Sequence, residues 1–262
     1  MRIKPQKGDR WTREEMILVL NLYLKLPYGQ MDHRNKQVKE LANIMGRTDN
    51  SIAMRLNNFA ACDPILSARG IKALGDQRDR CKPYWDEFVD NRDALVFESE
   101  RILAEYQDVA IEEKFEEDLM DIPKTLKGEE RVREVKTRVN QSFFRQMVLA
   151  NYGGKCALTG IDIMELLVAS HIIPWSDNEN ERLNPQNGIC LSSMIDKAFD
   201  RGLITFLNDG SVLFSNRLKS NVGKDYYSKY FEPIKNEKLI EPKKYLPNPI
   251  FLEYHRDTIF NK

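Results

Sequence analysis

Residues 169–175 read Ala-Ser-His-Ile-Ile-Pro-Trp, residues 187–192 read Asn-Gly-Ile-Cys-Leu-Ser, and residues 196–200 read Asp-Lys-Ala-Phe-Asp. Aliphatic residues lead into His171 and Pro174 follows it, which predicts a strand that ends near this histidine. The polar run between the first two stretches predicts a surface loop, and the second stretch predicts another short strand. The apolar residues of the third stretch have helical spacing, and Gly202 is a natural end for that helix. The sequence therefore predicts a strand, a strand and a helix in this order.

These stretches belong to four motifs that follow one another along the chain. They read Cys156-Ala-Leu-Thr-Gly160, Ser170-His-Ile-Ile-Pro-Trp175, Asn187-Gly-Ile-Cys-Leu191 and Asp196-Lys-Ala-Phe-Asp-Arg-Gly202. Their order and content resemble the HNH, or ββα-metal, nuclease family, and the likeness is closest to a branch that contains prokaryotic restriction enzymes. Four motifs in order are far more specific than a single histidine. The resemblance implies a metal-dependent DNA endonuclease, a hydrolase of phosphodiester bonds with a restriction or defence role.

The resemblance also implies roles for four residues. His171 would be the general base that takes a proton from the attacking water, which suits its ordinary pKa of ~6.5. Asn187 would hold the imidazole or its loop in place. Asp196, and Asp200 one helical turn later, would bind one divalent ion. Oxygen ligands favour Mg²⁺ or Mn²⁺, which would stabilise the leaving oxygen and the charge on the phosphate.

One position departs from the family pattern. Many HNH nucleases carry Asp or His immediately before the general base, as a metal ligand, and this chain has Ser170. The departure leaves open a protein that binds DNA on an HNH-like scaffold and does not cut it. A nuclease for RNA or for particular nucleic-acid structures also remains open. Without the motifs, His171 would be interpreted as a core histidine and the two aspartates as a solvated helix face.

The first 60 residues predict three helices. Thr12 and Glu15 form a capping box for the first, and two more are expected over residues 35–45 and 49–60. The W-T-x-x-E opening and the Gly-Arg-Thr turn between the second and third helices resemble a Myb-type or helix-turn-helix unit, whose third helix would read bases in the major groove. The DNA contacts that this implies are Arg47 in the turn and the outward residues Asn50, Ser51, Arg55 and Asn58. An ordinary three-helix bundle is the competing interpretation.

The chain is predicted to be an α+β protein with two domains. Residues 1–105 would form the helical DNA-binding domain, residues 106–130 an acidic linker, and residues 131–262 the nuclease domain with flanking helices and a β-hairpin. The first helix of the nuclease domain carries Arg138 and Arg145. These are candidate phosphate clamps, and solvated arginines on a helix face are the alternative.

The net charge is zero, but the charges are unevenly distributed. Residues 1–105 carry 18 Lys and Arg against 16 Asp and Glu, residues 106–130 carry 3 against 9, and residues 131–262 carry 19 against 15. An acidic middle therefore separates two mildly basic ends, for which we expect a modest and salt-sensitive affinity for double-stranded DNA.

Composition limits the remaining classes. The four cysteines do not form C-x-x-C pairs, so no structural zinc is expected. No apolar run approaches the length of a membrane span, and the amino terminus lacks the apolar core of a signal peptide. We therefore expect a cytoplasmic protein without a membrane partner. A homodimer would suit an enzyme that cuts both strands, by analogy only.

Overall fold

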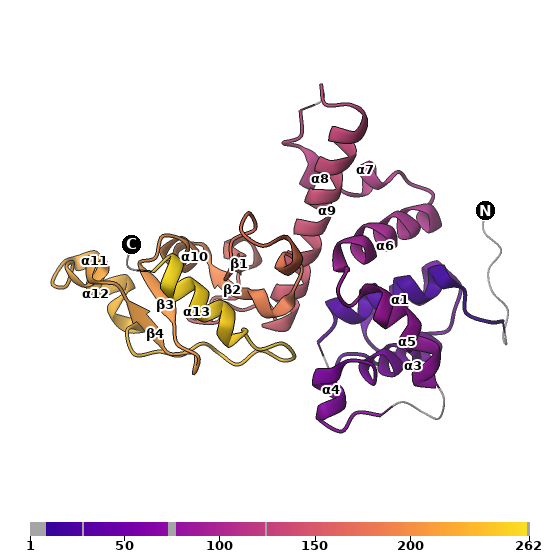
Figure 1. Ribbon diagram of the computed structural model, residues 1–262, viewed down its shortest axis with the longest axis horizontal. Coiled ribbons are helices and arrows are strands. Elements are labelled where there is room, and N and C mark those ends of the chain that lie inside the picture. Colours follow the sequence, from indigo (N-terminus) through magenta and orange to yellow (C-terminus); the bar gives the residue numbers. More distant parts are fainter. Residues whose placement is uncertain (1–8, 28, 73–76, 124, 261–262) are drawn as a thin grey trace. The chain divides into compact units, whose positions relative to one another are not determined.

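The computed structural model describes residues 9–27, 29–72, 77–123 and 125–260 (Figure 1). The chain divides into two compact units, Met1–Phe143 and Phe144–Lys262. The division falls inside the long helix α9 (Gly128–Asn151). The α+β class is confirmed, because the described residues are mostly helical and form two small sheets. No helix of the described residues is long and apolar enough to cross a membrane.

The first unit is helical. Its elements are α1 (Arg13–Lys25), α2 (Lys36–Met45), α3 (Asp49–Ala60), α4 (Pro64–Ala68), α5 (Gln77–Phe88), α6 (Arg92–Gln107), α7 (Ile111–Lys114), α8 (Glu116–Leu119) and the first part of α9. The predicted capping box starts α1, since Thr12 accepts from the Glu15 backbone N–H and Glu15 accepts from that of Thr12. Helix α1 is buried on nearly every side, and α3, α5 and α6 pack around it.

The acidic segment 106–130 folds with the first unit, which differs from the predicted division at residues 105 and 130. Its helix α7 places the Lys114 ammonium 2.6 Å from the carboxylate of Glu100, a residue of α6 that is only 2% exposed. Glu112 forms a second ion pair of 2.9 Å with Arg131 on α9. These two ion pairs attach the segment to α6 and α9, which explains why it is part of the first unit and not a separate linker.

The second unit contains the predicted strand, strand and helix. Strand β1 (Leu167–His171) pairs antiparallel with β2 (Gly188–Ser192), and α10 (Ser193–Asp200) follows directly. The predicted hairpin is formed by β3 (Ile204–Phe206) and β4 (Val212–Phe214). The remaining elements are η1 (Met164–Leu166), η2 (Glu179–Glu181), η3 (Pro185–Asn187), α11 (Asn216–Lys219), α12 (Asp225–Tyr230), η4 (Glu232–Ile234) and α13 (Pro249–Thr258).

Two glycines set how closely this unit packs. A Cβ on Gly188 would lie 2.3 Å from Val148 and 2.9 Å from Phe144, so only glycine lets β2 approach the last turns of α9. Gly202 has φ +62°, and a Cβ there would lie 2.2 Å from the Ile259 carbonyl oxygen. The first contact brings Phe144 against the strand pair, and the second seats the end of α10 against the residue that follows α13.

Candidate active site

His171 is the last residue of β1, and three neighbours fix its ring. Phe144 stacks on its face with centroids 3.8 Å apart, and Trp175 meets it edge-on at 5.5 Å. Its Nε2 lies 3.0 Å from the backbone carbonyl oxygen of Arg182. Because a carbonyl oxygen only accepts, Nε2 carries the hydrogen in the neutral ring. The other nitrogen, Nδ1, is then the one with a lone pair for a proton.

The His171 ring is largely buried, and burial lowers its pKa to about 4, although the bond to the Arg182 carbonyl acts in the opposite direction. The ring is therefore neutral at physiological pH. A neutral imidazole with a free Nδ1 has the protonation state that a general base needs.

A cavity of about 460 Å³ opens beside this histidine. It is lined by Val168, Ala169, Ser170, His171, Pro174, Trp175, Asp196, Lys197, Asp200, Arg201, His255 and Ile259. The end of β1 and one side of α10 thus meet at one space, and the structure brings His171, Asp196 and Asp200 together there, although they are dispersed in the sequence.

The two carboxylates carry excess negative charge. Burial raises the pKa of Asp196, and burial together with the charge of Asp196 raises the pKa of Asp200. Nearby Lys197 lowers both pKa values without reversing either shift. Two carboxylates that are harder to ionise because they share a partly buried space favour the arrival of a cation.

Ser170 adds a polar atom to the same wall of the cavity. Its residue is 2% exposed and its hydroxyl oxygen has no hydrogen-bond partner of ordinary geometry in the structure. The hydroxyl is still near enough to lower the pKa of Asp196. We interpret this as a close approach that falls short of a formed hydrogen bond.

These groups fit a hard divalent ion with few protein ligands. Among the described residues, no group of three or more His, Cys, Asp or Glu side chains could hold a metal. Mg²⁺ is commonly bound through one or two carboxylates and several waters, and Asp196 and Asp200 supply that number. The unsatisfied Ser170 hydroxyl is a further oxygen at the same place.

Asn187 lies outside the cavity. It is 1% exposed, its Oδ1 accepts from the Ile173 N–H at 2.8 Å, and its Nδ2 donates to the carbonyls of Ile173 and Glu181 at 3.1 Å. The carboxamide therefore ties together the loop that carries the His171 partner. Of the two roles expected for it, holding the loop agrees with these contacts and holding the imidazole does not.

His255 also lines the cavity, but both of its ring nitrogens are occupied. Nδ1 lies 2.8 Å from the Thr205 hydroxyl, and Nε2 lies 3.2 Å from the Phe199 carbonyl oxygen, while the ring stacks on Phe199 at 3.7 Å. This histidine joins α13 to α10 and β3, and it has no free nitrogen for chemistry.

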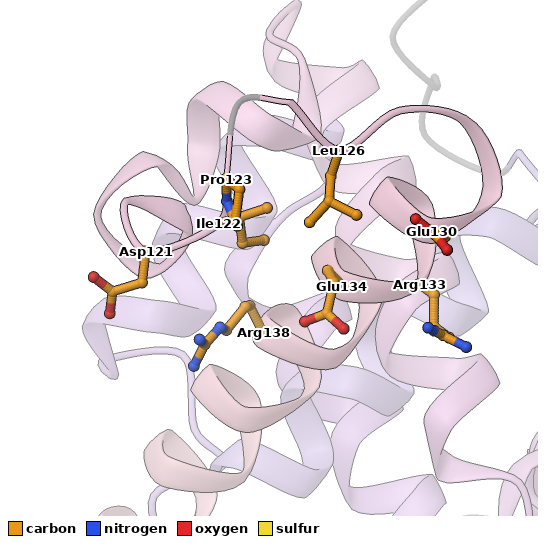
Figure 2. A pocket seen from close by; sticks show the side chains of 8 residues that line it. All are labelled: Asp121, Ile122, Pro123, Leu126, Glu130, Arg133, Glu134 and Arg138. Atoms are coloured by element: carbon orange, nitrogen blue, oxygen red, sulfur yellow. The ribbon is translucent and has the colours of Figure 1, made fainter.

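Of the two expected phosphate clamps, Arg145 is bound to backbone carbonyls, and a phosphate contact of Arg138 stays a prediction. Arg145 donates to the Leu167 carbonyl at 2.6 Å and to the Met164 carbonyl at 3.0 Å, so it holds the start of β1. Arg138 lies in the first unit, 3.4 Å from the Gln141 side-chain oxygen. It lines a separate cavity of about 440 Å³ with Glu134, beneath the segment that precedes α9 (Figure 2).

Two of the residues predicted to face outward from α3, Arg55 and Asn58, are buried, and a third predicted DNA contact, Arg47 in the turn, is paired within the first unit. Arg55 is 8% exposed and its guanidinium lies 4.8 Å from the Trp11 ring, and Asn58 is 2% exposed. Arg47 forms a 2.8 Å ion pair with buried Glu15. The error arises because α5 covers a face of α3 that an isolated three-helix unit would expose, as the approach of Arg55 to Cys81 on α5 shows.

Two of the predicted residues remain on the surface of α3. Asn50 is exposed, and Ser51 is half-exposed with its hydroxyl donating to the Thr48 carbonyl at 2.8 Å. The outward face of this helix is therefore smaller and less basic than the sequence predicts.

Sequence reasoning missed Arg182 and Phe144. Arg182 contributes a backbone carbonyl to the His171 ring. Every residue has such a carbonyl, so the residue type at this position does not predict the contact. Phe144 could have been found, because it lies in the same helical stripe as the neighbouring apolar residues.

Two antiparallel strands are followed by a helix, with a histidine on the first strand and carboxylates on the helix around one cavity, and together they form a ββα site. Residues 156–207, about one fifth of the chain, match the family model described as HNH endonuclease. This segment, from Cys156 to the residue after β3, thus belongs to the HNH family, as its motifs indicate, and suggests nuclease-type activity on nucleic acid. A search of curated proteins returned no match.

Proposed function

We propose that this protein is a divalent-metal-dependent DNA endonuclease that hydrolyses phosphodiester bonds at the cavity beside His171. One observation carries the proposal: the Arg182 carbonyl accepts a hydrogen bond from Nε2–H of His171, which leaves Nδ1 as the proton acceptor of a residue that lines one cavity with Asp196 and Asp200. A base and a cation-binding carboxylate pair are the two parts that metal-assisted hydrolysis requires.

The residues of the chain divide the work. Nδ1 of His171 accepts a proton from a water, whose oxygen attacks phosphorus while the bond from phosphorus to the leaving oxygen breaks. The Arg182 carbonyl, still bonded to Nε2–H, stabilises the positive ring that forms. Asp196 and Asp200 would hold Mg²⁺ or Mn²⁺, which when bound supplies charge stabilisation at the phosphate and the leaving oxygen.

Two cations, one on α10 and one directly after it, would meet the substrate. Lys197 and Arg201 are exposed, line the same cavity as the carboxylates and lie one helical turn apart. Lysine and arginine side chains both donate charge-assisted hydrogen bonds to phosphate oxygens. A phosphodiester chain that crosses the cavity could therefore be held on each side of the bond to be cut.

Double-stranded DNA as substrate and a cytoplasmic restriction or defence role are the finer parts of the proposal. They rest on the motif resemblance and on the exposed Asn50 of α3, which remains able to meet a groove. Homodimerisation would be needed only if both strands are cut in one event.

The test is cleavage of a supercoiled plasmid with Mg²⁺ or Mn²⁺, with and without a chelator. His171→Ala should reduce cleavage by at least about 100-fold, since a general base typically contributes about 10²–10⁴-fold to the rate. It should leave the DNA shift in a gel unchanged. His33→Ala is the matched control, because His33 is an exposed histidine of the other unit. Parental cleavage by His171→Ala would remove this residue from the mechanism.

The second candidate is a DNA-binding protein without catalysis. It is favoured by Ser170 at a position where a carboxylate would strengthen the metal site. A protein that shifts plasmid DNA in a gel and never nicks it with either ion, at any enzyme concentration tested, would support this candidate over the nuclease.

A further inference from the structure

The loop between β1 and β2, residues 172–187, is tied to itself by Arg182. The Arg182 Nε donates to the Trp175 carbonyl at 2.7 Å, and the guanidinium carbon lies 5.1 Å from the centroid of the Trp175 ring. An ion pair of 3.2 Å also joins Arg182 to Glu179, but the Glu179 side chain is 79% exposed, so this contact contributes little. The carbonyl bond and the ring contact are the ones that fix the arginine.

The same residue meets His171 through its backbone. Its carbonyl oxygen is the partner of His171 Nε2, at 3.0 Å, and the Trp175 ring that its side chain covers meets His171 at an interplanar angle of 84°. Of the three groups around the His171 ring, only Phe144 comes from a helix. The other two come from the loop, which Asn187 also holds, and the Arg182 guanidinium contacts the Trp175 carbonyl and ring directly.

Arg182 is directed inward, not toward the substrate. Its side chain is 21% exposed, and it is not among the residues that line the cavity beside His171. An arginine that served to hold phosphate would present its fork to that space. The observed contacts instead use its planar group for a carbonyl and an indole of its own loop.

We propose that Arg182 is a positioning residue for the nuclease reaction: its guanidinium holds the loop so that its carbonyl keeps the His171 hydrogen on Nε2 and leaves Nδ1 to face the attacking water. This inference rests on the proposed function for its catalytic consequence. The positioning itself is a property of the folded protein and exists without substrate or metal.

The first measurement is the NMR spectrum of the full chain with ¹⁵N-labelled histidine. The chain has three histidines, and His171→Ala assigns the signals of the one in question. The parent should show a hydrogen-bonded Nε2–H proton for His171, Arg182→Ala should lose it to exchange with water, and Arg182→Lys should keep it, because an ammonium group can still reach the Trp175 carbonyl. Arg217→Ala, an exposed arginine on α11, is the matched control and should leave the signal unchanged.

The second measurement is the steady-state cleavage rate of the same variants. Arg182→Ala should lower kcat on the order of 100-fold, as expected when a reacting group moves by about 1 Å, with KM within twofold of the parent. Arg182→Lys should recover at least tenfold of that loss.

The outcomes separate the inference from the function beneath it. An Arg182→Ala protein that retains the Nε2–H signal overturns the positioning role, and so does one whose KM rises while kcat is kept, since that pattern belongs to a phosphate contact. If the parent does not cleave DNA but Arg182→Ala loses the signal, the proposed nuclease function fails and the positioning of His171 stands.

Discussion

Replacing Glu100 with Gln should destabilise the amino-terminal unit by about 3 kcal/mol. The Glu100 carboxylate is 2% exposed and accepts from Lys25 and Lys114 at 2.6 Å and from Asn21 at 3.0 Å. Burial raises its pKa, but the two lysines lower it further, to about 2 against an ordinary 4.5. At 1.36 kcal/mol for each pH unit, the difference corresponds to about 3 kcal/mol.

The dependence on pH has a definite sign. The pKa of Glu100 is lower in the folded than in the unfolded chain, so its contribution to the free energy of unfolding is complete above pH 4.5 and is lost as the pH falls toward 2. Glu100→Gln should therefore be less stable than the parent at pH 7, and the gap between them should narrow as the pH is lowered through that window.

Urea unfolding followed by tryptophan fluorescence measures the effect, because Trp11 and Trp85 lie in the first unit. Lys114 is also released in the variant, so proteolysis within residues 106–130 should become faster. Glu112→Gln is the control. The Glu112 side chain is 47% exposed, so loss of its ion pair with Arg131 should lower the free energy of unfolding by at most about 1 kcal/mol. Equal losses in the two variants, or a Glu100→Gln protein as stable as the parent at pH 7, would refute the reasoning.

Three further predictions concern the second unit. Asp196→Asn should weaken Mn²⁺ binding at least tenfold, measured by calorimetry, and abolish cleavage; unchanged binding would place the ion elsewhere. Lys197→Gln and Arg201→Gln should each raise KM and reduce the slope of log affinity against log salt by about 1, as expected for a lost phosphate contact; an unaltered slope would exclude that role. Gly188→Ala should cost about 1–3 kcal/mol of stability, because its Cβ would lie 2.3 Å from Val148, and should broaden the His171 signals by displacing Phe144; a fully stable variant would show that β2 can move away.

The sequence was most informative where local rules act alone. The Thr12 and Glu15 capping box, the turn at the hairpin and the strand that ends at His171 all depend on a few neighbouring residues, and each is present in the structure. The convergence of His171 with Asp196 and Asp200 followed from the order of the motifs, since strand pairing and a directly following helix leave little freedom.

The sequence was least informative about charged side chains that serve the fold. Arg55 and Arg145 were assigned to nucleic acid because an arginine on a helix usually faces solvent. In the structure one is covered by α5 and the other donates to two backbone carbonyls, and neither arrangement can be anticipated from spacing within a single helix. When the partner of a charged side chain is in another element or in the main chain, the spacing of residues within the helix does not reveal it.

Helix α9 bears on how the second unit could be isolated. The two compact units meet at Phe143 and Phe144, and Phe144 is the ring against which His171 stacks. A fragment that began at residue 144 would keep only the last two turns of that helix, too few to remain helical without the turns before them. A fragment that carries the ββα unit should therefore start no later than Gly128, and the whole of α9 should be kept with that unit when it is fused to another domain.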